Sequence, residues 1–185
     1  MKLQLIIALL ALTHNVFATE KPSAIQADIA FRIFSMTCIE HAGNHDKIKS
    51  WAAGKLQIAN PEFSKQVLKE RTGVVYGASN RIGEYLLVLT EPNQCSVWAR
   101  KADAEQIENT LAKLANALQK ANSALKVAKT TEQDSIDHKG QPFHQVGYTL
   151  SSAADPFTVH LLATTSKIEN ADMQAILTYS KHPVQ

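Results

Sequence analysis

Two histidines four positions apart form the best metal-binding pattern in the chain. His41 and His45 each have an acidic neighbour, and a helix running through both would present the two imidazoles on one face. Two imidazoles provide half of the four ligands of a tetrahedral zinc site. No motif specifies a third ligand, because nothing in the spacing selects either His144 or His160.

The residues between these histidines favour a different structure. Gly43 and Asn44 are typical of a helix end, so the same segment also fits a solvated polar loop. The chain has no glycine-rich phosphate loop and no G-x-S-x-G nucleophile elbow. We therefore predict a non-enzymatic binding or interaction module without a cofactor. The alternative is a metal-dependent hydrolase that uses His41 and His45.

The only two cysteines, Cys38 and Cys95, predict one disulfide bond. The bond would close a loop of about 58 residues, for which chain entropy gives a stabilisation of roughly 4 kcal/mol. A pair of buried free thiols, or one reactive thiol, is the alternative. No C-x-x-C motif is present, which argues against a thiol–disulfide oxidoreductase.

A predicted strand over residues 95–100 provides the best candidate for a binding surface. In a strand with Cys95, Val97 and Ala99 on one face, the alternate residues share the other face. A tryptophan and an arginine on the helix-free face of a sheet could anchor a partner. The alternative is that the tryptophan packs in an ordinary cluster on that face. The candidate surface comprises Ser96, Trp98 and Arg100, with Asn80 and Arg81 from a nearby hairpin tip.

Hydrophobic periodicity and turn residues predict the order of the remaining elements. A helix capped by Ser23 and Gln26 reaches Cys38, a short helix starts at Asn60, and a long helix is capped by Asp103. His160 falls inside a strand and fits a hydrogen-bonded strand histidine better than a catalytic base. Strands are predicted at residues 74–76, 84–90, 95–100, 144–151 and 157–164, with a weaker one at 129–134. Residues 172–180 fit either a strand or a helix, and the composition of Ala175–Tyr179 favours a final strand.

Short turns between neighbouring strands predict an antiparallel sheet, and the long helix connects its two halves. The expected fold is an α+β two-layer sandwich. Five to six strands form its sheet, and all helices cover the face that holds Cys95. The outline is similar to that of profilin-like sheets, an analogy that carries no function.

The first eighteen residues predict a secretory signal peptide. Lys2 precedes the apolar run Leu3–Leu12, and Val16 and Ala18 supply small residues for cleavage after Ala18. A run of about ten residues is too short to span a bilayer. We therefore expect one domain over residues 19–185, located in the periplasm or secreted. A formal net charge of +2 with interspersed signs argues against nucleic-acid binding. The expected partner is an envelope protein or a small ligand, with no membrane span in the mature chain.

A family resemblance covers roughly residues 30–120. A helix ending in Cys38 precedes Gly73-Val-Val-Tyr76, Gly83-Glu-Tyr-Leu-Leu-Val-Leu89 and Cys95-Ser-Val-Trp-Ala99, before a helix that starts at Asp103. This order resembles a group of small proteobacterial envelope proteins that carry signal peptides and have no assigned function. The resemblance implies a bacterial source and an envelope or secreted location, and it implies no activity.

Overall fold

One antiparallel sheet of eight strands runs through the described part of the chain, residues 21–137 and 139–184 of a computed structural model. The spatial order is β1-β2-β3-β4-β8-β7-β6-β5. The predicted signal peptide lies outside the described residues. The strands are β1 Gln57–Ile58, β2 Gly73–Ser79, β3 Glu84–Thr90, β4 Gln94–Ala99, β5 Lys126–Ile136, β6 Pro142–Ser151, β7 Phe157–Thr165 and β8 Ala175–Pro183.

The centre of the sheet joins two antiparallel halves that form from separate parts of the chain. Strands β1–β4 follow one another across the first half, and β5–β8 follow one another inward from the far edge. Strand β8 then pairs with β4, with Leu177 opposite Val97. Helix α4, Ala104–Ala121, connects the halves. Of residues 172–180, for which the sequence left strand and helix open, those from Ala175 onward form this central strand, as the favoured interpretation expected.

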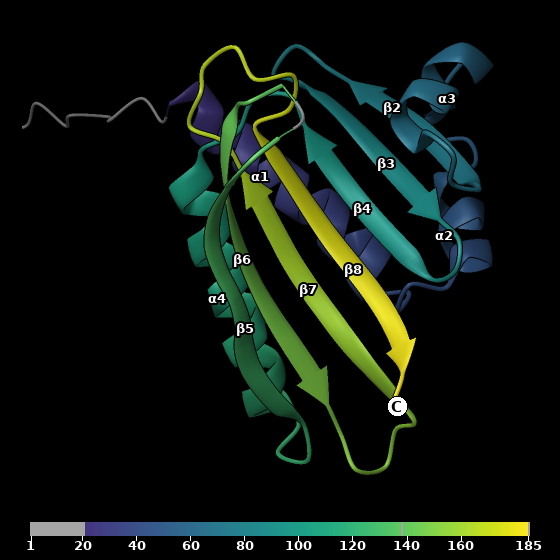
Figure 1. Cartoon of the computed structure of the whole chain (residues 1–185). Coiled ribbons are helices and arrows are strands. Elements are labelled where there is room, and N and C mark those ends of the chain that lie inside the picture. The colour runs from purple at the N-terminus through teal and green to yellow at the C-terminus, as the bar shows by residue number, and fades with distance from the viewer. Residues whose placement is uncertain (1–20, 138, 185) are drawn as a thin grey trace, which may run out of the picture.

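The larger helices cover one face of the sheet and form the main core with it. Helix α1, Pro22–Phe34, and α4 lie behind the sheet in Figure 1. Helix α1 continues into a π-helical turn, η2 Ser35–Ile39, and α2 follows at His45–Ala52. Phe34, Leu111 and Leu177 are fully or almost fully buried in this core. No helix among the described residues has the length and apolar character needed to cross a membrane.

The predicted disulfide is confirmed. Cys38, in η2, is bonded to Cys95, in β4, and their Cα atoms are 5.5 Å apart. Both side chains are completely buried. The bond therefore fastens the N-terminal helix to the middle of the sheet. It also confirms that Cys95, Val97 and Ala99 share the face covered by α1.

The predicted count of five to six strands is wrong, because the sheet has eight. Strand β1 has only two residues, both exposed, so no hydrophobic pattern marks it. Strand β5 is an eleven-residue edge strand in which every residue is exposed or only partly buried. Its apolar alternation is weak for that reason, and the sequence indicated only its central part as a possible strand.

The prediction that all helices cover one face is also wrong. Helix α3, Pro61–Leu68, lies next to β2 and packs on the opposite face. Val67 and Leu68 join Val75, Leu86 and Val88 in a second, smaller cluster. The sheet therefore has helices on both faces of its first half, and the space beside α3 becomes the candidate site.

Two of the three N-caps predicted from the sequence form in the structure. The Asn60 side chain accepts a hydrogen bond from the Phe63 amide at 2.8 Å, and Asp103 accepts one from the Gln106 amide at 2.9 Å. Helix α1 differs from the prediction, because Lys21 is its N-cap residue and makes no side-chain cap bond. Ser23 lies inside the helix, where Pro22 at the first position already sets the helical backbone angle.

Replacing Asp103 with alanine is expected to lower the free energy of unfolding by about 1 kcal/mol, because the Gln106 amide loses its cap. Urea denaturation followed by far-UV circular dichroism measures the loss. Ser23→Ala is the matched control and is expected to change stability by less than about 0.5 kcal/mol, since this predicted cap does not form. Equal losses in the two variants would contradict the assignment of the caps.

Candidate binding groove

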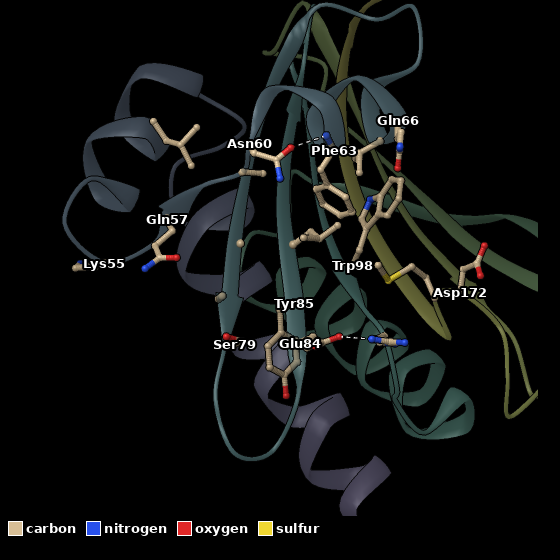
Figure 2. A pocket seen from close by; sticks show the side chains of 18 residues that line it. Lys55, Gln57, Asn60, Phe63, Gln66, Ser79, Glu84, Tyr85, Trp98 and Asp172 are labelled. Atoms are coloured by element: carbon tan, nitrogen blue, oxygen red, sulfur yellow. Dashed lines mark hydrogen bonds and ion pairs between the residues drawn. The ribbon is translucent and has the colours of Figure 1, made fainter.

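A groove of about 910 Å³ lies between α3 and the second face of the sheet. We call it the α3 groove. Its apolar walls come from α3, β1, β3, β4 and the segment before β8, and Figure 2 shows Phe63 and Trp98 both facing this space. The apolar side chains that line it include Ile58, Phe63, Val67, Leu86, Trp98 and Met173.

The strand period places Trp98 in this groove. Cys95 and Val97 face the main core, so Trp98 faces the opposite side, where it packs beside the small cluster under α3. Phe63 reaches the groove from the first turn of α3, directly after the Asn60 cap. Phe63 is 37% exposed and Ile58 is 69% exposed. The groove therefore presents apolar surface to solvent.

Three of the four charged residues that line the groove are paired, and the ammonium of the fourth, Lys55, lies over the Trp51 ring. The guanidinium of Arg100 donates to the Glu84 carboxylate at 2.7 Å, and this hydrogen bond raises the pKa of Arg100. Asp172 is bonded to Lys139. Gln57 and Gln66 add uncharged amide groups to the lining. Apart from Lys55, the lining therefore offers neutralised charges, amides and apolar side chains, which suits a segment with apolar side chains at its centre.

The structure brings only two of the predicted binding residues together in the groove. Trp98 and Arg100 line it. Ser96 is buried, and its hydroxyl forms a 3.0 Å hydrogen bond with that of Thr178 on β8. The Asn80 side chain accepts hydrogen bonds from two backbone amides of its own hairpin tip, and Arg81 is exposed there.

The sequence does not indicate most of the lining, and three apolar residues show why. The spacing of Phe63, Val67 and Leu68 predicts that all three point into the core, whereas Phe63 lines the groove. No pattern marks Ile58 or Met173. The turn signal at Asn60 and Pro61 located α3 correctly, and it carried no information about which face of the sheet the helix would cover. Met173 arrives from a segment far along the chain, which no local pattern could indicate.

The shared helical face required by a metal site at His41 and His45 does not form. The first helical segment ends before His41, and α2 starts at His45 after an Asn44 cap. His45 uses both ring nitrogens, at 3.1 Å from the Glu91 carboxylate and 3.0 Å from the Gln94 carbonyl. Within residues 21–137 and 139–184, no three histidine, cysteine or acidic side chains gather in a way that could hold a metal ion.

A carboxylate on α4 binds two side chains of the sheet. Glu108 accepts a hydrogen bond from the Thr165 hydroxyl and lies 3.0 Å from Nδ1 of His144. The hydroxyl donates to the carboxylate and not to the imidazole, so the histidine does not activate it as a nucleophile. The cluster instead fastens α4 to β6 and β7. His160 also makes a hydrogen bond, to Thr149 at 3.2 Å, as expected for a strand histidine.

Comparisons with protein-family models, with curated proteins and with solved structures found no match to this chain.

Proposed function

We propose that this protein is a non-enzymatic, exported binding module that holds an extended segment of a partner protein in the α3 groove. One observation carries the proposal: Trp98 and the solvent-exposed ring of Phe63 converge on one open groove of about 910 Å³. Exposed aromatic side chains that line a common concave surface are typical of the centres of protein interfaces.

The lining favours a peptide over an ionic ligand. Trp98, Phe63 and Met173 provide contacts for apolar side chains, and tryptophan, phenylalanine and methionine are enriched at interfaces. Gln57 and Gln66 can donate to and accept from a peptide backbone. Because Arg100 is already paired with Glu84, the bound segment is expected to carry no charge at its centre.

The exported location rests on the signal-peptide pattern of residues 1–18 and is supported by the disulfide. A buried bond between Cys38 and Cys95 is stable in an oxidising compartment and uncommon in the reducing cytosol. An envelope protein is therefore the proposed class of partner.

The test is a selection of random twelve-residue peptides displayed on phage, with the purified protein as bait. We expect the enriched peptides to contain aromatic and aliphatic residues without charge at their centre. Trp98→Ala should weaken the binding of a selected peptide at least about tenfold, measured by isothermal titration calorimetry. Because Trp98 lies partly exposed at the edge of its cluster, the variant is expected to fold, and circular dichroism checks this.

The matched control is Ile136→Ala, which removes an apolar side chain that is 68% exposed on β5 and lies outside the groove. This variant is expected to bind the selected peptides as the unchanged protein does. The proposal is wrong if no peptide is enriched, or if Trp98→Ala binds the selected peptides with unchanged affinity.

A further inference from the structure

Two histidines meet on the helix-free face of the second half of the sheet, away from the α3 groove. His160 lies on β7 and His182 on β8, where His160 is opposite Ser180 and His182 is opposite Thr158. The two imidazoles are therefore diagonal neighbours on one face, with ring centroids 5.3 Å apart and an angle of 73° between the ring planes. Both line a hollow of about 320 Å³.

One nitrogen of each ring is held by a hydroxyl group. Nδ1 of His160 lies 3.2 Å from the Thr149 hydroxyl. The Thr149 hydroxyl also forms a 2.9 Å hydrogen bond with the Thr130 hydroxyl. Nε2 of His182 lies 3.1 Å from the Ser180 hydroxyl. When these nitrogens donate, Nε2 of His160 and Nδ1 of His182 carry the lone pairs, and neither makes a hydrogen bond within the described residues. Metal-binding histidines are commonly oriented by such a bond on the other nitrogen.

The spacing of the rings matches a shared ion. Two imidazole nitrogens at about 2.1 Å from a tetrahedral ion place their ring centroids about 5 Å apart. The observed separation is 5.3 Å.

We propose that His160 and His182 form a two-histidine site for a divalent transition metal ion, with water completing its coordination. Imidazole suits Cu²⁺, Ni²⁺ and Zn²⁺, whereas Ca²⁺ and Mg²⁺ require oxygen ligands, mainly carboxylates. The hollow also contains Glu91, but its carboxylate is bound to His45. The site therefore selects for imidazole-binding metals, with Cu²⁺ bound more tightly than Zn²⁺.

The test is a titration of the untagged protein with Zn²⁺, followed by calorimetry and by NMR of the histidine ring nitrogens. We expect saturable binding, with the largest shifts at Nε2 of His160 and Nδ1 of His182. His160→Gln and His182→Gln should each weaken binding at least about tenfold, while Ca²⁺ should not bind. The exposed position of His182 makes its variant the safer one for folding.

The control is His41→Gln, which removes a histidine outside the hollow and leaves the bond between His45 and Glu91 in place. It is expected to bind Zn²⁺ as the unchanged protein does. The proposal is overturned if Zn²⁺ fails to bind, if the ring nitrogens of His160 and His182 do not shift, or if His182→Gln binds Zn²⁺ with unchanged affinity. Loss of binding only in the control would assign the metal to His41.

Discussion

Replacing both Cys38 and Cys95 with alanine is expected to lower the free energy of unfolding by about 4 kcal/mol. The bond joins positions 57 residues apart in the sequence, and opening it restores the chain entropy that this loop loses in the unfolded state, worth roughly 4 kcal/mol. Small domains are commonly stable by only about 5–15 kcal/mol, so the loss is a large share of the total.

Urea denaturation measures this loss, and a reducing agent provides the control. Reduction breaks the bond in the unchanged protein and leaves both sulfur atoms in the buried core. The reduced protein should therefore approach the double variant in stability, with a difference that reports only the packing of the two sulfur atoms. A double variant as stable as the oxidised protein would contradict the assigned role of the bond.

Replacing Gly73 with alanine is expected to cost at least about 2 kcal/mol, because a Cβ atom there has no space. It would lie 2.1 Å from the backbone oxygen of Leu89 and 3.0 Å from Cδ2 of Leu68. A backbone atom in a paired strand cannot rotate away, so the start of β2 must separate from β3. Leu68 belongs to α3, and the same shift therefore disturbs the helix that walls the groove.

Gly77→Ala is the control for this prediction, since Gly77 lies in the same strand and a Cβ atom there meets nothing within 4 Å. We expect its free energy of unfolding to change by no more than about 0.5 kcal/mol, or to rise slightly because the unfolded chain loses entropy. Thermal unfolding of both variants in parallel gives the comparison. Similar losses at the two positions would show that steric exclusion at Leu89 is not the cause.

The strands that could be predicted from the sequence are those with one or two buried faces. Glu84–Thr90 is an almost continuous apolar run, and it forms β3, in which all residues after Glu84 are buried. Strand β1 escaped prediction because its pairing depends on β2 and not on burial of its own side chains. Strand β5 lies at the sheet edge, where charged residues are favoured and the alternation of apolar and polar residues is weak.

The candidate groove was only partly predictable for a related reason. Strand alternation placed Trp98 on the correct face, because the position of Cys95 fixed the other face. The remaining wall depends on α3 crossing to that face, which is decided by tertiary packing of Val67 and Leu68. Likewise, the i, i+4 spacing of His41 and His45 predicted a shared face only if one helix continued, and the Asn44 cap starts a new helix instead.

The pairing of β4 with β8 has a consequence for how the chain reaches its native state. Strand β4 lies at the centre of the sheet, yet its second neighbour is separated from it in sequence by α4 and three further strands. Contacts of this range make folding slow, since a long loop must close, at a cost in chain entropy, before the paired strands stabilise the chain. Until β8 has been synthesised and docks, β4 presents an open edge flanked by apolar side chains. That interval is when the chain is most exposed to aggregation, and when a holding chaperone would protect it best.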